Sequence, residues 1–511
     1  MRTTQRWIAI ALVAGLGCGA DDPVTVVHIE ARPAVGSIAQ IEVSFDNDNA
    51  TLRQTFAVTG KDFPLSFSVE TPGRSGTLVI HADAKSGSGE VRAIGDVAVE
   101  LDPAGRVDAE LMLEPNDFVV NTTFVGTQDL AFRLDAGGRQ LSAGSDGHFT
   151  IGWSDTCQMV GRCDVFGRRF DQTGTAITTA IAAGTTQFNF NQTSGPTGYE
   201  PSLATDRSGN TLAAWSTDGE LYAVVVDAEG AALSGLETQV TALTTPGTPA
   251  AIALPDGRYV VAWADDSVTM GQRVIRARYL SAAGVPINNP ITNTAAAYQV
   301  STTIMTTDNP PAMVGLGNGA LAIAWQDGSQ LRGRFYGTTG TASTGTDIVL
   351  ATYPAADDLS PPQLGTIGGD ALLLYRRGTV GGDADTGQLV MRRVSSQGTR
   401  IGGDAIVTDD VELGPPGIAT LDGDVAVVWS ACTTGSDGAG CGIWLRHYGV
   451  DLAPRTGPLR VNTTTPGDQE DPSVAWLPGQ AAAVAWSDGS AADPDRDGGA
   501  VRARIMYPTA E

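Results

Sequence analysis

LPDGRYVVAW, the stretch from Leu254 to Trp263, occurs in recognisable copies through the last three quarters of the chain. Each copy has an extended run, a Gly-containing tight turn and an apolar run that ends in an aromatic residue. The seven aromatic anchors are Trp153, Trp215, Trp263, Trp325, Tyr375, Trp429 and Trp486. Consecutive anchors lie 48 to 62 residues apart, close to the length of a four-stranded propeller blade. The repeat therefore predicts seven similar modules, each containing a strand, a hairpin and a strand.

The apolar run has no polar side. In the copy from Leu321 to Trp325, which reads LAIAW, side chains that point to opposite faces of a strand are all apolar. Such a strand has to be covered twice, as in a blade that lies between two neighbouring blades. A third strand follows after a loop of variable length, for example at 274–280 and 500–506. We therefore predict an all-β fold with a seven-bladed β-propeller over residues 116–511.

The two ends of the repeat array indicate how the ring closes. The sixth module ends with the segment Val461–Thr464, yet the chain stops at Glu511, directly after the third strand of the seventh module. A similar segment, FVVNTT, occurs before the first module at Phe118–Thr123. Gly126 and Gln128 follow it just as Gly467 and Gln469 follow the later copy. We predict that 118–123 completes the last blade, which removes the exposed sheet edges of an open array.

The first 17 residues have the features of an export signal. Arg2 and Arg6 precede an apolar stretch, 7–16, that is too short to span a bilayer as a mature helix. With Gly17 and Cys18, the segment resembles a bacterial lipoprotein signal peptide, although Gly15 stands where that family usually has Leu. The resemblance implies that Cys18 is acylated and anchors an exported protein to the outer membrane or cell surface, through a tether at 18–23. The alternative is an ordinary signal peptide with an incidental cysteine.

Residues 24–115 differ from the repeats. Seven short alternating runs predict a small β-sandwich, Ig-like or transthyretin-like in type. The runs are 24–31, 40–45, 55–58, 65–70, 76–84, 91–101 and 107–113. The region resembles membrane-proximal domains of exported bacterial proteins, which implies a spacer; partner binding is the alternative.

Four cysteines form two close pairs, Cys157 with Cys163 and Cys432 with Cys441, each in the loop just after an anchor. We expect two disulfides and hence an oxidising compartment. A zinc site built from the four thiolates is the alternative.

The chain carries 32 basic and 57 acidic residues, a net charge of −25, which opposes nucleic-acid binding. We expect a monomer.

The post-anchor loop of the seventh module contains Asp493, Asp495, Asp497 and Gly498. This D-x-D-x-D-G pattern resembles the calcium loops of EF-hands and integrin-type propellers, which implies a Ca²⁺ site. The EF-hand's last ligand is absent, because that position is Arg504. Asp383 and Asp385 form a weaker second candidate. The alternative in both places is a solvated acidic hairpin tip.

Arginines gather in the third strands, often two residues apart and therefore on one strand face. They are Arg168, Arg169, Arg276, Arg278, Arg332, Arg334, Arg392, Arg393, Arg446, Arg502 and Arg504. We predict that they pair with carboxylates just past the anchors and hold blade to blade, the expected carboxylates being Asp155, Asp265, Asp327 and Asp488. A surface for anionic glycans is the alternative. The anchors are expected to be core residues, whereas Trp444 and Trp476 lie outside the series and are candidates for an exposed contact.

Catalytic patterns are absent from the sequence. His28, His81, His148 and His447 are scattered, and no nucleophile elbow, zinc-protease or phosphate-loop motif occurs. The array resembles the DG-x-x-V-x-x-W repeats of exported bacterial propeller and RTX-associated surface proteins. That resemblance implies a membrane-anchored, non-catalytic scaffold whose variable loops bind a glycan or a protein partner. No catalytic residue is assigned. A polysaccharide-degrading hydrolase or lyase is the alternative, since carboxylates paired across blades could form its site; a purely structural envelope component is a third.

Overall fold

The structure is a computed structural model. It describes residues 8–9, 23–48, 50–122, 127–130, 139–155, 163–178, 186–192, 198–217, 219–242, 247–269, 272–305, 309–316, 319–354, 359–378, 387–411, 415–432, 438, 440–492, 494–496 and 499–508. The chain divides into two compact units, Met1–Phe118 and Val119–Glu511. In the described part of the chain, no helix is long and apolar enough to cross a membrane.

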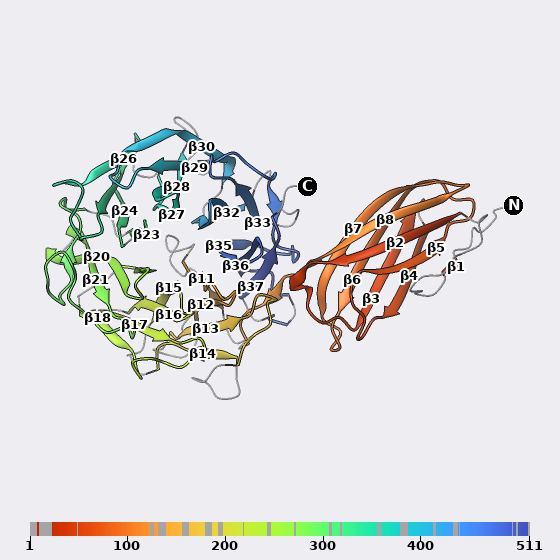
Figure 1. The fold of residues 1–511 in the computed structure, drawn as a ribbon, viewed down its shortest axis with the longest axis horizontal. Coiled ribbons are helices and arrows are strands. Elements are labelled where there is room, and N and C mark those ends of the chain that lie inside the picture. The colour runs from red at the N-terminus through yellow and green to blue at the C-terminus, as the bar shows by residue number, and fades with distance from the viewer. Residues whose placement is uncertain are drawn as a thin grey trace. The chain divides into compact units, whose positions relative to one another are not determined.

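The first unit is a path of eight hydrogen-bonded strands in the order β1-β5-β2-β8-β7-β6-β3-β4 (Figure 1). Its strands are β1 Ile8–Ala9, β2 Val24–Ala31, β3 Gln40–Asn47, β4 Ala50–Ala57, β5 Leu65–Glu70, β6 Gly76–Lys85, β7 Val91–Leu101 and β8 Arg106–Pro115. All seven expected runs fall on strands, although the run 55–58 ends one residue past β4. Alternate residues of β2, β3, β5 and β6 are buried in one apolar core, as their period of two requires. The Ig-like or transthyretin-like topology stays a prediction.

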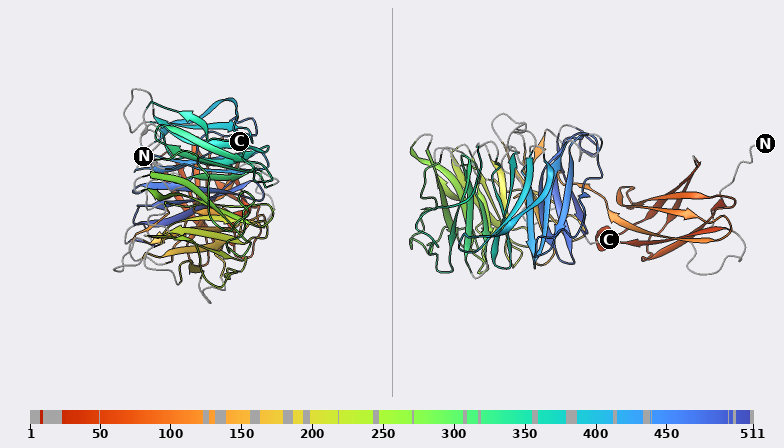
Figure 2. Two further views of the ribbon diagram at one scale, coloured as in Figure 1. Left: turned by 90° about the vertical axis from the view of Figure 1, so that its left-hand side faces the viewer. Right: turned by 90° about the horizontal axis from the view of Figure 1, so that it is seen from above.

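The second unit is the predicted seven-bladed propeller, in which seven sheets surround an axis (Figure 1). In chain order, blade 1 contains β10 Gln128–Asp129, β11 Leu141–Ala143, β12 Phe149–Asp155, β13 Val165–Phe170 and β14 Gln187–Asn189; blade 2 contains β15 Tyr199–Thr205, β16 Thr211–Ser216, β17 Glu220–Val226 and β18 Thr238–Ala242; and blade 3 contains β19 Ala250–Ala253, β20 Tyr259–Thr269, β21 Gln272–Leu280 and β22 Tyr298–Gln299. Blade 4 contains β23 Ala312–Gly315, β24 Leu321–Asp327, β25 Gln330–Tyr336 and β26 Ile348–Thr352, and blade 5 contains β27 Gln363–Ile367, β28 Asp370–Gly378, β29 Gly387–Val394 and β30 Arg400–Val411. Blade 6 contains β31 Gly417–Leu421, β32 Asp424–Ala431, β33 Gly442–Tyr448 and β34 Leu459–Arg460, and blade 7 contains β35 Gln469–Leu477, β36 Ala481–Asp488, β37 Ala500–Met506 and β9 Phe118–Val119. Figure 2 shows the ring from the side, where the strands run between its two faces.

The tight turn that recurs in the repeat has a local cause. In LPDGRYVVAW the Gly257 amide donates to the Leu254 carbonyl at 3.0 Å, and the Leu254 amide donates to the Arg258 carbonyl at 2.7 Å. Gly257 has φ of +83°, a conformation that residues with a Cβ rarely adopt. The glycine therefore allows the innermost strand to turn back tightly into the anchor strand.

Six of the seven anchors, Trp215 to Trp486, pack in apolar clusters with the blade that precedes their own. In blade 4, Leu321, Ile323 and Trp325 of β24 join a cluster with blade 3, whereas Ala322 and Ala324 of the same strand join a cluster with blade 5. The prediction that this strand is covered on both faces is confirmed. Trp153, Trp215, Trp263, Trp325, Tyr375 and Trp486 have no measurable exposure, and Trp429 is 3% exposed. The anchors are core residues, as expected.

The ring closes through a strand from before the first blade. Strand β9 lies beside β37 as the outermost strand of blade 7. Past β9, the Val120 amide donates to the Val501 carbonyl at 2.7 Å. The buried Asn121 side chain accepts a bond from the Val501 amide at 3.0 Å and donates to Gln128 at 3.0 Å. The predicted closure is confirmed.

The later sequence copy repeats this arrangement inside the chain. Asn462 accepts a bond from the Ile443 amide at 2.9 Å and donates to Gln469 at 3.0 Å. An asparagine-glutamine pair therefore connects the end of blade 6 to the start of blade 7, and an equivalent pair connects the end of blade 7 to the start of blade 1. Only blade 7 is completed by a distant segment.

We predict that Asn121→Ala lowers the free energy of unfolding by about 2–4 kcal/mol, because the Val501 amide loses its buried acceptor and Gln128 loses its donor. Asn462→Ala is the matched comparison and should cost less, since Asn462 makes the equivalent bonds to Ile443 and Gln469 but not the bond that Asn121 donates to the buried Asp495. Urea unfolding followed by tryptophan fluorescence measures both. An Asn121→Ala protein as stable as the unchanged chain would contradict this closure.

Candidate functional site

Seven apolar side chains form a ring around the propeller axis. They are Leu141, Leu203, Ala251, Met313, Leu364, Ile418 and Val474, one from the innermost strand of each blade. Each is paired across the sheet with the residue two positions before the anchor, for example Met313 with Ile323 and Val474 with Val484. We call this set the axial ring. Its repetition in register explains why the axis is lined mainly by apolar groups.

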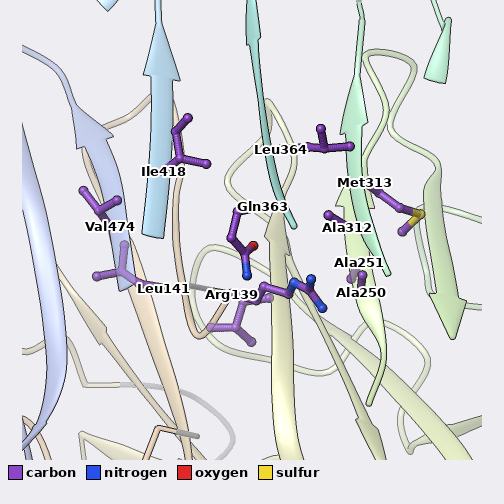
Figure 3. A pocket seen from close by; sticks show the side chains of 11 residues that line it. Arg139, Leu141, Ala250, Ala251, Ala312, Met313, Gln363, Leu364, Ile418 and Val474 are labelled. Atoms are coloured by element: carbon purple, nitrogen blue, oxygen red, sulfur yellow. The ribbon is translucent and has the colours of Figure 1, made fainter. Parts of the chain in front are cut away.

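A cavity of about 140 Å³ lies at the axial ring. Two polar side chains also line it, Arg139 and Gln363, which are only 9% and 4% exposed. Arg139 lies two residues before Leu141, a position that proline occupies in the six other blades. Figure 3 shows the Arg139 side chain reaching toward Ala250 and Ala251, with the Gln363 amide turned toward Arg139. The cavity thus combines one cationic group and one amide with an apolar wall.

The arginines opposite the anchors form ion pairs inside their own blades. Arg332 lies 2.8 Å from Asp327, Arg502 lies 2.5 Å from Asp488, and Arg276 pairs with Asp265. Three of the expected carboxylates are therefore correct, but they join two strands of one blade instead of two blades. In blade 1 the residue opposite the anchor is Phe166, so Asp155 has no arginine at the equivalent position.

A second set of arginines, two residues further along, does join blades. Arg168 donates to the Val120 carbonyl at 2.7 Å, Arg446 to the Val407 carbonyl at 3.1 Å and Arg504 to the Val461 carbonyl at 2.7 Å. Each acceptor belongs to the preceding blade. Further members are Arg278 to the Val240 carbonyl and Arg392 to the Leu350 carbonyl. We call these five residues the seam arginines.

The seam arginines are committed to structure. Burial lowers the pKa of Arg168 to about 10, yet at neutral pH its guanidinium stays charged and bonds a carbonyl. In blade 4 the equivalent Arg334 lies 3.9 Å from Asp347, whose carboxylate accepts bonds from the amides of Thr302 and Thr303 in blade 3. Blade 2 has Val224 at this position. Seam arginines are thus a poor basis for a glycan-binding surface.

The post-anchor loops and the connections between blades meet at one face of the ring, because successive strands alternate in direction. We call it the loop face. There Cys432 and Cys441 form the predicted disulfide. The Cys441 amide donates to Asp468 at 3.1 Å, and the Gln469 amide donates to the Cys441 carbonyl at 3.0 Å. Cys163 is also disulfide-bonded, while its expected partner Cys157 lies outside the described residues.

The expected calcium ligands are described only in part. Asp493, Asp497, Asp383 and Asp385 lie outside the described residues, as does the expected acylation site Cys18. Asp495 is fully buried and accepts a hydrogen bond from the Asn121 amide group at 2.8 Å. One oxygen of Asp495 therefore serves the closure of the ring. Calcium coordination by this loop stays a prediction.

Of the two tryptophans outside the anchor series, Trp444 is half-buried opposite Trp429. The expectation for Trp476 is wrong, because this side chain is only 8% exposed and donates to the Ala419 carbonyl of blade 6 at 3.1 Å. His447 is buried between Asp424 and the Pro508 carbonyl. These contacts are structural.

Glu470, at the start of β35 on the loop face, has an unusual electrostatic environment. The pKa of its carboxyl is raised, first by burial and then by the nearby negative charges of Asp468 and Asp129. Sequence reasoning missed both Glu470 and Arg139. A comparison of the modules could have found Arg139, since it replaces a proline; Glu470 carries no such signal.

We predict that Glu470→Gln stabilises the protein at neutral pH. Folding raises the pKa of this carboxyl, so above its folded pKa the ionised carboxylate lowers the stability of the folded protein. Below the pKa of the unfolded chain, near 4.5, the carboxyl is protonated in both states and the loss of stability disappears. The gain over the unchanged chain should therefore shrink as the pH falls to about 4. Thermal unfolding at several pH values measures it. Glu229→Gln, an exposed turn carboxyl, is the control and should change little; a pH-independent gain at Glu470 would contradict the assignment.

No protein family and no curated relative matches the chain. Several solved structures resemble it at low identity. A protein of unknown function from Dyadobacter fermentans is 13% identical, with 76% of this chain and 99% of that chain covered and a TM-score of 0.40. The NanB sialidase of Streptococcus pneumoniae is 11% identical, with 96% and 95% covered and a TM-score of 0.42. The leech intramolecular trans-sialidase is 10% identical, with 98% and 97% covered and a TM-score of 0.38. Likenesses this distant concern the propeller fold alone and do not transfer an activity.

Proposed function

We propose that the chain is an exported, lipid-anchored scaffold that binds a glycan or an envelope protein without transforming it. The observation that carries this proposal is the size and lining of the axial cavity. At about 140 Å³ it is smaller than the ~300–1,000 Å³ of usual ligand pockets. A polymer or a protein partner must therefore bind outside the axial cavity.

The loop face is the surface best suited to this task. Between the second and third strands, the connection has two residues in blade 4, ten in blade 6 and eleven in blade 7. The blades beneath these loops keep one register. Loops of different length on a rigid ring are the usual basis of a specific binding surface. The Cys432–Cys441 disulfide and its bonds to Asp468 and Gln469 hold part of that surface in place.

Attachment to the membrane follows from the lipoprotein-like segment. Cleavage before Cys18 and acylation of its thiol would leave the mature chain on a lipid anchor, with calcium bound at Asp493, Asp495 and Asp497 as an additional element of the loop face. The acidic composition favours a neutral or cationic partner over an anionic polymer.

A polysaccharide-degrading enzyme is the second candidate, and Glu470 is the observation that favours it. A carboxyl with a raised pKa beside two other carboxylates is the kind of group that donates a proton in glycoside hydrolysis. Its position at the start of the innermost strand β35 places it on the same face as the loops.

We predict that Cys18→Ser moves the protein from the membrane fraction to the soluble fraction of a bacterial host, because a signal peptide without the acylated cysteine leaves no anchor. Fractionation and detergent partitioning of both chains measure this. A variant in which Asp21 is replaced by Ser is the control and should stay with the membrane. Equal partitioning of the Cys18→Ser protein and the unchanged chain would contradict lipid anchoring.

We predict saturable binding in a screen of glycans and envelope proteins, carried out with calcium and with chelator. Glu470→Lys on the loop face should weaken that binding by about tenfold, whereas Glu229→Lys on the opposite face should leave it unchanged. Loss of binding with both variants alike would place recognition elsewhere. Shortening of a polysaccharide during the screen would establish the enzyme instead.

A further inference from the structure

We propose that the axial cavity binds a small monocarboxylate with an apolar body, and that Arg139 holds its carboxylate. This site lies on the axis and is separate from the loop face, so it stands independently of the partner proposed above.

The cavity exists because the axial ring is incomplete on one side. Six members of the ring are Leu, Ile, Val or Met, but the blade 3 member is Ala251. Two more alanines line the cavity, Ala250 beside it and Ala312 of blade 4. Figure 3 shows Arg139 reaching toward the Ala250–Ala251 side of the cavity. The guanidinium therefore approaches the one part of the ring where side chains leave room.

The chemistry of the wall selects the ligand. A guanidinium binds a carboxylate through two parallel hydrogen bonds, and the Gln363 amide can donate a further one. The other nine lining residues have apolar side chains, which favours a hydrocarbon body, although polar atoms make up most of the surface that the cavity exposes. A doubly charged phosphate would bring a second charge out of water opposite a single cation, at a considerable cost. A cavity of similar size, about 150 Å³, holds a benzene molecule, so the body has about six carbon atoms.

The backbone that carries Arg139 is held in place before any ligand arrives. Its carbonyl accepts a hydrogen bond from the Leu203 amide of blade 2 at 2.9 Å, and its amide donates to the Gln140 side chain at 2.9 Å. The neighbouring Leu141 amide donates to Ser473 of blade 7 at 3.1 Å. Three blades therefore fix the backbone that carries the guanidinium, which reduces the ordering cost of binding.

The test uses the purified chain and two matched probe pairs, benzoate with benzamide and hexanoate with hexanamide. Titration calorimetry and ligand-observed magnetic resonance measure binding. We expect saturable binding of at least one carboxylate, at least about tenfold tighter than its amide. Equal affinity for acid and amide, or no binding of either acid, would overturn the proposal.

Two variants separate the cavity from general effects. Arg139→Met keeps the stem but removes the charge, and should weaken carboxylate binding about tenfold or more. Ala251→Leu completes the axial ring and should abolish binding while the protein stays folded with Arg139 in place. Arg460→Met, at an exposed arginine of β34, is the control and should bind as the unchanged chain does. Unchanged affinity in a folded Ala251→Leu protein would place the ligand elsewhere and sink the proposal.

Discussion

The contact between each blade and the one before it is the interaction on which this structure depends. The anchor aromatic enters an apolar cluster shared with the preceding blade, and in five blades a seam arginine reaches a carbonyl of that same neighbour. Buried guanidinium groups are costly unless they are hydrogen-bonded, so each of these arginines stabilises one spacing between blades. Because every blade needs a predecessor, an open array would leave one anchor and one arginine exposed. Closing the ring gives the first blade a preceding blade, so its anchor is buried and its seam arginine is hydrogen-bonded like the others.

The same contact connects the rim of the propeller to its axis. In blade 7, Val474 of the axial ring is opposite Val484, and Val484 is opposite Arg504, which bonds the Val461 carbonyl of blade 6. Residues opposite each other share one face of the sheet. A row of side chains therefore runs from the axial ring to the seam. The strand register that positions the seam arginines also fixes how far the axial ring lies from the axis. The ring therefore cannot contract around a small residue such as Ala251, and a cavity is left there.

Features that repeat along the chain could be predicted from the sequence, and features that depend on a neighbour could not. The anchors, the turn glycine and the closing strand recur with their local pattern, so seven blades and their closure were correctly predicted. The arginine spacing correctly placed both guanidinium groups on one strand face. It could not show that Arg502 stays within its blade while Arg504 reaches the next, since that depends on how blades pack. Trp476 was misjudged for the same reason, because its partner Ala419 lies in blade 6. Arg139 was missed since 131–138 separates it from the first strand of its module and hides its equivalence to the prolines.

The junction between blades 7 and 1 differs from the others because the last two strands of blade 7, β37 and β9, come from opposite ends of the propeller sequence. The pair Asn121–Gln128 repeats the pair Asn462–Gln469, but Asn121 also donates to the buried Asp495. That additional bond offsets part of the entropy lost when two distant parts of the chain are brought together. It also places one residue of the predicted calcium loop in the closure network. A cation held by Asp493, Asp495 and Asp497 would be bound in part by a carboxylate that also accepts a hydrogen bond from Asn121, and would favour the closed ring over the open one. Metal binding and ring closure would then stabilise each other, as linkage requires of any ligand that binds only the folded state.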